Sequence, residues 1–149
     1  MSSDSMFKYF IFCLALCSLV YADGEWVPKT SYEAYRIMQQ CLSEHPFNKE
    51  QLAMIMQNFF FPNEPEVRQH LLCYYQMHGL FSTLEGFHPD RVAKIEKLDL
   101  NEEEVLQIAQ GCVDRNEQKS PADEWVFRFH ICLMSSKVGD RAKIINNIV

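Results

Sequence analysis

Four cysteines have the spacing that most restricts the chemistry of this sequence. Cys41, Cys73, Cys112 and Cys132 are separated by 31, 38 and 19 residues. A structural zinc site usually takes its cysteines in pairs two to four residues apart, so these gaps disfavour zinc. An even number of cysteines in an oxidising compartment instead favours two disulfides. Four cysteines allow three pairings, and spacing alone does not choose among them.

Histidines are the other side chains that could do chemistry: His45, His70, His78, His88 and His130. His70 and His78 could share a helical face, but no acidic or cysteine partner stands at ligand spacing. A serine–histidine–aspartate order, a reactive thiol and a glycine-rich phosphate loop are not recognisable either. We therefore expect no metal, no cofactor and no catalytic residue, and the sequence does not indicate an enzyme.

The first 22 residues have the pattern of a secretory signal peptide. Lys8 supplies the positive end, Tyr9 to Val20 form an apolar run, and the small residue Ala22 favours cleavage after it. A membrane anchor is the alternative, but the run is too short to span about 30 Å of hydrocarbon. We therefore expect a secreted, extracellular protein in which residues 23–149 form one domain.

The charge balance excludes two classes of partner. The chain has a formal net charge of −6, whereas nucleic acids and anionic membranes are bound through basic patches. We expect neither nucleic-acid binding nor membrane insertion. Cys13 and Cys17 leave with the signal peptide, so only the four later cysteines belong to the fold.

Helical patterns run through almost the whole mature sequence, and no alternating strand pattern of useful length interrupts them. Several expected helices begin with a capping side chain followed three residues later by an acid or amide. These pairs are Thr30 with Glu33, Asn48 with Gln51, Asn63 with Glu66, and Asn101 with Glu104; Ser120 before Pro121 is a fifth start. The expected helices are 31–44, 49–60, 64–78, 89–97, 102–115, 121–135 and 140–148. The fold class is all-α, with six to seven short helices and two disulfides.

Three segments around the cysteines resemble insect odorant-binding proteins of the pheromone/general odorant-binding family. They are Cys73-Tyr-Tyr-Gln-Met-His-Gly-Leu-Phe, Gly111-Cys112-Val113-Asp114 and Phe129-His130-Ile131-Cys132-Leu133, which resemble the surroundings of the family's third, fourth and sixth cysteines. The family usually has six cysteines, and its second and fifth would fall at Gln69 and near Asp123. This chain therefore resembles a reduced, four-cysteine form. The surviving pattern implies the disulfides Cys41–Cys73 and Cys112–Cys132.

The resemblance implies a carrier that holds a small hydrophobic ligand in an internal cavity between helices. The ligand would be an odorant, a pheromone, a hormone or a fatty acid. Methionine and aromatic side chains suit such a cavity because they offer adaptable, large apolar contact areas. The candidate ligand-binding residues are Met56, Phe59, Phe60, Tyr74, Met77, Phe81, Phe87, Ile108, Trp125, Phe129 and Met134. For any one of them, ordinary core packing is the competing interpretation.

Two local features make this expectation more specific. Phe59, Phe60 and Phe61 cannot all face one core, so at least one should face a cavity, a second subunit or solvent. We expect the cavity between the helix of Trp125 and Phe129 and the segment around Met77 and Phe81.

The apolar end of the chain should act as a lid over that cavity. Its side chains are Ile144, Ile145, Ile148 and Val149, and an untethered tail is normally polar. A permanently packed last helix and a dimerisation patch are the alternatives. Members of this family often release ligand as pH falls, and His130 or His78 near the mouth could then loosen the lid.

The alternative function is a salivary or haemolymph effector of the same fold that binds a host mediator or a protein target. Capture of an amine needs several carboxylates inside the pocket, whereas the last helix offers Asp140 and then Arg141 and Lys143. Apolar ligands are therefore favoured over amines. A receptor and a second copy of the chain stay open as further partners.

Overall fold

The computed structural model describes residues 24–146. The expected signal peptide, residues 1–22, lies outside the described residues, as do Ile148 and Val149 of the expected lid. The described helices are α2 (Ser31–Glu44), α3 (Lys49–Asn58), α4 (Pro65–Met77), α5 (Pro89–Glu96), α6 (Glu102–Cys112), α7 (Ala122–Met134) and α8 (Lys137–Ile145). The all-α prediction is confirmed. Within this range, no helix has both the length and the hydrophobicity needed to cross a bilayer.

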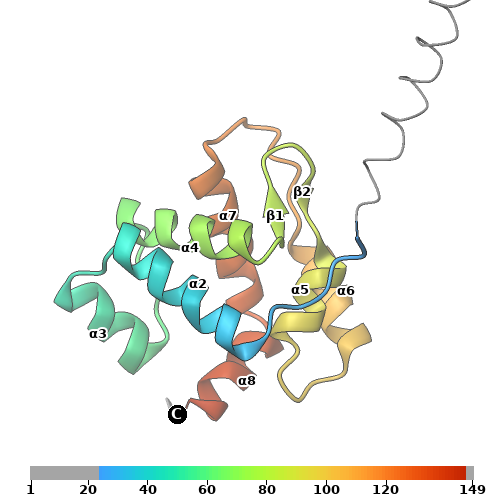
Figure 1. The fold of residues 1–149 in the computed structure, drawn as a ribbon, viewed down its shortest axis with the longest axis horizontal. Helices are drawn as coiled ribbons and strands as arrows, with labels where there is room; N and C mark the ends of the chain where they lie inside the picture. The colour runs from blue at the N-terminus through green and yellow to red at the C-terminus, as the bar shows by residue number, and fades with distance from the viewer. Residues whose placement is uncertain (1–23, 147–149) are drawn as a thin grey trace, which may run out of the picture.

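Two disulfides connect helices that are distant in sequence. Cys41 of α2 is bonded to Cys73 of α4, and Cys112 of α6 is bonded to Cys132 of α7. These are the two pairs that the resemblance implied. Figure 1 shows α7 passing behind α4 at the centre, with α2 and α3 to one side and α5 and α6 to the other.

The capping signals located some helix starts better than others. Thr30 and Asn48 each form the predicted reciprocal capping box, with Glu33 and Gln51 respectively. Asn63 was wrongly expected as a cap: its side chain instead accepts a hydrogen bond from Arg68 Nη1, and the helix begins one residue later.

Three further helix boundaries, two starts and one end, differ from the prediction. α8 starts three residues earlier than expected, because the Ser136 hydroxyl accepts a hydrogen bond from the Val138 amide. Ser120 does not cap α7: its hydroxyl oxygen accepts from Arg128 Nη1 instead, and the first turn has no side-chain cap. α6 ends at Cys112, before the expected Arg115.

A short antiparallel hairpin follows α4 and was not predicted. Strand β1 (Phe81–Ser82) pairs with β2 (Gly86–Phe87), and strands of two residues are too short to show an alternating pattern. α4 ends in a Schellman motif at Gly79, with φ at +68°, in which the Gly79 and Leu80 amides bond back to Gln76 and Tyr75. This turn brings both strands against α7.

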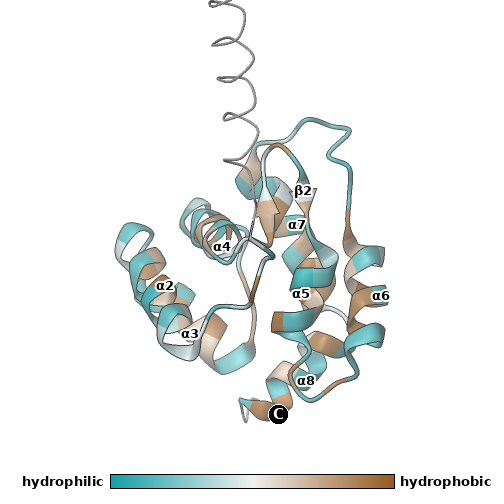
Figure 2. Ribbon diagram, turned by 45° about the vertical axis from the view of Figure 1, so that its right-hand side comes forward, coloured by the Kyte–Doolittle hydropathy of each residue, from teal (hydrophilic) through white to brown (hydrophobic). Residues whose placement is uncertain are grey.

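Aromatic rings fill the core where the hairpin meets α4 and α7. The members of this aromatic cluster are Tyr75, Phe81, Phe87, Trp125 and Phe129. Phe87 stacks on Phe129 with ring centroids 4.1 Å apart, and Trp125 stands almost perpendicular to Phe81 at 5.1 Å. Figure 2 shows that the surrounding helices carry both hydrophobic and hydrophilic residues, as expected of amphipathic helices with one face on a core.

Candidate functional site

An apolar pocket of about 270 Å³ is lined by side chains of both α4 and α7, and none of the five rings of the aromatic cluster lines it. Helices α2, α3, α4, α5, α7 and α8 and the loops beside them all contribute side chains to it. Its lining residues are Met38, Phe47, Ile55, Phe59, Phe61, His70, Leu71, Tyr74, Glu96, Leu98, His130, Met134, Val138 and Ala142. Most of this wall is aliphatic or aromatic, so the space suits a small apolar molecule.

Helical spacing brings the central lining residues together. His70 and Tyr74 lie one turn apart on α4, and His130 and Met134 lie one turn apart on α7. Ala142 lies on the next turn of α8 after Val138, which is buried. The pocket is therefore bounded by regular helices rather than by loops alone.

The three consecutive phenylalanines after α3 divide between the pocket and solvent. Phe59 ends α3 in the left-handed conformation, with φ at 51°. Phe59 and Phe61 both line the pocket and meet edge to face, with ring centroids 5.5 Å apart. Phe60 points away and is 57% exposed. The expectation that these three rings could not share one core is confirmed.

His130 is a polar residue in the pocket wall. Its Nδ1 lies 3.2 Å from the hydroxyl oxygen of buried Tyr75, whereas its Nε2 is buried without a hydrogen-bond partner among the described residues. Burial lowers the pKa of His130 to about 3. The imidazole is therefore neutral in mildly acidic solution, where the sequence alone had suggested that it might become charged and loosen the lid.

Glu96 and Tyr74 form a second polar group. The Tyr74 hydroxyl donates a hydrogen bond to Glu96 Oε1 across 3.0 Å. Burial raises the pKa of the Glu96 carboxyl, and the bond from Tyr74 only partly offsets this. Burial and the nearby Glu96 charge also raise the pKa of Tyr74. Within residues 24–146, Glu96 has no ion-pair partner.

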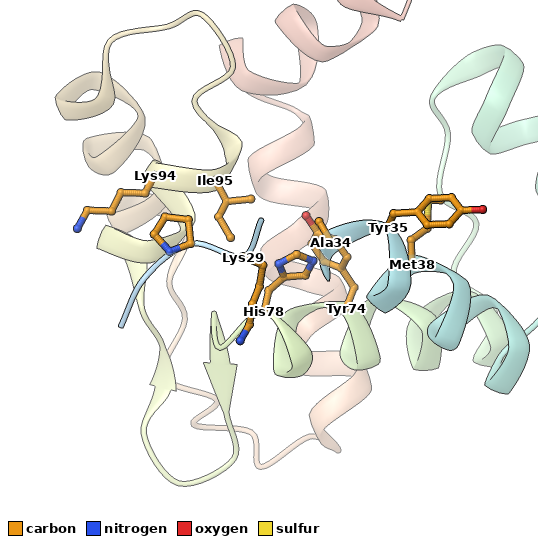
Figure 3. A pocket seen from close by; sticks show the side chains of 9 residues that line it. Lys29, Ala34, Tyr35, Met38, Tyr74, His78, Lys94 and Ile95 are labelled. Carbon is orange, nitrogen blue, oxygen red and sulfur yellow. The ribbon is translucent and has the colours of Figure 1, made fainter. Parts of the chain in front are cut away.

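A wider surface pocket of about 480 Å³ adjoins the apolar pocket, because Met38 and Tyr74 line both. Figure 3 shows Tyr74 and His78 side by side at its centre, with Lys94 and Ile95 of α5 on one side and Tyr35 and Met38 of α2 on the other. Burial and the nearby Lys29 charge lower the pKa of His78.

The eleven predicted ligand-binding residues occupy four kinds of environment. Phe59, Tyr74 and Met134 line the apolar pocket. Phe81, Phe87, Trp125 and Phe129 belong to the aromatic cluster, and Ile108 packs half-buried against the same core. Met56 and Phe60 are exposed, and Met77 lies at shallow surface hollows between α2 and α4. Where the cavity was expected, the rings of Phe81, Trp125 and Phe129 pack with Phe87 in this cluster.

The predicted set omits most of the lining residues, both apolar ones such as Phe47, Ile55 and Leu98 and polar or small ones such as Glu96 and Ala142. Among these, Glu96 could have been found most easily from the sequence. It lies one helical turn after Val92, which is buried on the same short helix. His70 and His130 stand one turn before Tyr74 and Met134, so helical spacing from those two candidates could have found them. Ala142 gives no signal of its own.

No group of three or more histidine, cysteine or acidic side chains is placed to hold a metal ion within the described part of the chain. The pocket thus offers apolar contacts, two imidazoles (His70 and His130) that each have one buried nitrogen without a partner among the described residues, and one carboxyl–phenol pair. Such an arrangement can enclose and orient a small molecule.

Comparisons with known proteins agree with this geometry. Residues 23–136 match the PBP/GOBP family. The general odorant-binding protein 99a of Drosophila melanogaster is 27% identical over 134 residues, which cover 87% of this chain and 93% of that protein.

Proposed function

The chain belongs to the PBP/GOBP family, and on that premise we propose that it is a soluble carrier of small, mainly apolar molecules. The observation that carries this proposal is the apolar pocket of about 270 Å³ lined by side chains from six helices. The name of the Drosophila relative supports the same class of function. The pocket binds and orients its ligand, and we assign it no catalytic step.

Secretion is part of the proposal. The expected signal peptide covers residues 1–22, and the two disulfides are typical of proteins that fold in an oxidising compartment. A carrier of this kind works in an extracellular fluid, where it keeps a poorly soluble molecule in solution.

The size of the apolar pocket restricts the ligand. Sites for small molecules usually have volumes of about 300–1,000 Å³, so a pocket of about 270 Å³ suits a compact ligand. Met38 and Tyr74 also line the adjoining surface pocket, and we propose that a longer ligand extends past them into it. We expect affinity to rise with ligand chain length until both spaces are filled.

Displacement of the fluorescent apolar probe N-phenyl-1-naphthylamine tests this proposal. Neither Trp26 nor Trp125 lines the apolar pocket, so the emission of the probe is a better reporter than that of tryptophan. Ala142→Phe places a large ring in the pocket from α8 and should abolish high-affinity binding of the probe. Leu84→Phe is the matched control, because Leu84 is 96% exposed in the turn of the hairpin and does not line the pocket.

The outcomes separate the carrier from the alternative function. Binding by the natural chain and by Leu84→Phe, with loss in a folded Ala142→Phe variant, supports a carrier that uses this pocket. Equal binding by all three would place the site elsewhere. No binding of the probe by the natural chain would contradict the carrier proposal and favour an effector that acts on a protein.

A further inference from the structure

We propose that His130 is the polar anchor of the apolar pocket, and that its Nε2–H donates a hydrogen bond to a carbonyl oxygen of a neutral ligand. The ligand class is then an apolar ketone, aldehyde or ester rather than a hydrocarbon, a carboxylate or an amine. This inference rests on the proposed carrier function and assigns the residue that sets its specificity.

The hydrogen bond with Tyr75 fixes which nitrogen of His130 carries the proton. Tyr75 is 1% exposed, and burial keeps its phenol protonated by raising its pKa. A buried hydroxyl needs an acceptor, and His130 Nδ1 at 3.2 Å is its partner among the described residues. Nδ1 therefore accepts the bond, and in a neutral imidazole the proton then sits on Nε2.

This leaves His130 Nε2–H as a buried donor without a partner, on a residue that lines the pocket. His130 is 8% exposed and lines the pocket, whereas Tyr75 on its Nδ1 side does not. Nε2 is buried and has no hydrogen-bond partner in the described part of the chain. The Phe61 ring stands almost perpendicular to the imidazole, with centroids 4.4 Å apart, but an N–H···π contact is weaker than a bond to oxygen.

A buried donor without an acceptor destabilises the empty pocket and discriminates between ligands. A ligand oxygen that accepts from Nε2–H restores the bond that the imidazole lost when it left water. A hydrocarbon of the same shape cannot do so, and it leaves the donor unpaired. Discrimination therefore comes from the polar atom of the ligand, while affinity comes mainly from the apolar wall.

Glu96 makes a neutral ligand preferable to a carboxylate. Its carboxyl group lines the same pocket and is bonded to Tyr74. A ligand carboxylate would bring a second acidic group into the same apolar space, where two like charges disfavour each other. A fatty acid is therefore expected to bind more weakly than a ketone of equal length.

A matched pair of ligands tests the anchor. The ketone 2-decanone and its isostere 2-methyl-1-decene differ only in a carbonyl oxygen replaced by a methylene group. Both are measured by displacement of N-phenyl-1-naphthylamine from the oxidised protein, together with decanoate and decylamine. The quantity of interest is the ratio of the alkene to the ketone dissociation constant, compared between variants so that the different solubilities of the two ligands cancel.

We expect His130→Phe to lower this ratio by about tenfold, the effect of one net hydrogen bond. His45→Phe makes the same chemical change outside the pocket and should leave the ratio unchanged. Tyr75→Phe removes only the bond that fixes the tautomer, so the ratio should fall partly while the probe still binds. Nitrogen-15 spectra of His130 should show the Nε2–H tautomer in the natural chain and a mixture in Tyr75→Phe.

Four results would overturn the anchor. They are an unchanged ratio in a folded His130→Phe variant, an Nδ1–H tautomer in the natural chain, decanoate binding more tightly than 2-decanone, and decylamine binding most tightly with its advantage lost in Glu96→Gln. The tautomer measurement decides the question even where His130→Phe does not fold. Failure of the natural chain to bind the probe would instead overturn the carrier function itself.

Discussion

Arg68 Nε donates a hydrogen bond to Asp123 Oδ2 across 2.9 Å and so joins α4 to α7. Both side chains are largely buried. The family pattern places its second and fifth cysteines at Gln69 and near Asp123, which this chain lacks. The ion pair therefore connects the same two helices, beside the positions where a third disulfide would join them.

Arg68 and Asp123 should stabilise the fold as a coupled pair. Asp123→Ala leaves the Arg68 guanidinium largely buried without its carboxylate, and we expect a loss of about 3 kcal/mol in the free energy of unfolding. The double variant Arg68→Ala with Asp123→Ala should lose less than the sum of the two single changes. Urea unfolding with both disulfides intact measures all three, and additive losses would show that the two residues are not coupled.

The helices could be predicted from the sequence because their signals are local. The capping boxes at Thr30 and Asn48 involve side chains three residues apart, so no tertiary knowledge is needed to find them. Asn63 failed as a cap because Arg68 takes its side-chain oxygen. The hairpin after Gly79 was not predicted, because its strands are stabilised by the packing of Phe81 and Phe87 on α7 and not by a pattern visible in the sequence.

The pocket could be predicted only in part, because apolar residues look alike in sequence whether they line a space or fill one. Phe129 and Met134 lie five residues apart on α7, yet Phe129 is stacked in the aromatic cluster and Met134 lines the pocket. Which face of α7 meets the core depends on how α4 crosses it. The polar atoms of the pocket depend on partners distant in sequence, such as Tyr75 for His130.

His130 should make the fold less stable in mild acid. Its pKa is about 3 in the folded chain, against an ordinary value of 6.5, so the unfolded state binds a proton that the folded state does not between these pH values. The free energy of unfolding should therefore fall with decreasing pH in this window, by about 1.4 kcal/mol per pH unit from this group. Urea unfolding between pH 7 and pH 4 measures the slope.

His130→Gln should flatten that slope relative to the natural chain. Burial also lowers the pKa of His70 and of His78, so each contributes in the same direction, and His70→Gln should flatten the slope as well. Carboxyl groups shared by all variants cancel in the comparison. Parallel stability curves for His130→Gln and the natural chain would contradict the buried, neutral imidazole on which the ligand anchor depends.

Glu96 should have the opposite dependence on pH. Burial raises the pKa of its carboxyl in the folded chain, so its contribution to stability is present below the unfolded pKa and is lost as pH rises through the folded one. Glu96→Gln removes the charge and still offers Tyr74 an oxygen acceptor. We expect this variant to be more stable than the natural chain at pH 7.5, with little gain at pH 4.

Whereas Glu96→Gln removes the charge, Tyr74→Phe removes the hydrogen bond that Glu96 accepts. It removes the hydroxyl that donates to Glu96 Oε1 and leaves the carboxyl buried without that bond, so it should destabilise the chain most at high pH. Guanidinium midpoints at pH 7.5 and pH 4 measure both variants. An equal shift of Glu96→Gln at both pH values would show that the charge on Glu96 does not oppose folding.

The C-terminal lid expected from the sequence leads to the last prediction. α8 lines the pocket through Val138 and Ala142, whereas Ile144 and Ile145 are 50% and 46% exposed. Deleting residues 144–149 should therefore keep the wall of the pocket and remove only the segment that could close over it. We expect the bound probe to dissociate about tenfold faster, which corresponds to about 1.4 kcal/mol of lost contact, with the fold retained.

Gly139→Ala provides the comparison that separates a lid from the wall of the pocket. A Cβ atom at Gly139 would lie 1.8 Å from the Met134 carbonyl oxygen, so this variant must displace the start of α8 and should lose both stability and binding of the probe. Stopped-flow dissociation and thermal unfolding distinguish the two changes. If the deletion leaves the dissociation rate unchanged, or unfolds the chain as Gly139→Ala is expected to, the tail is a structural element. Faster release from a folded, truncated chain would instead assign the closing of the pocket to residues beyond Lys143, because the lining side chains of α8 would still be in place.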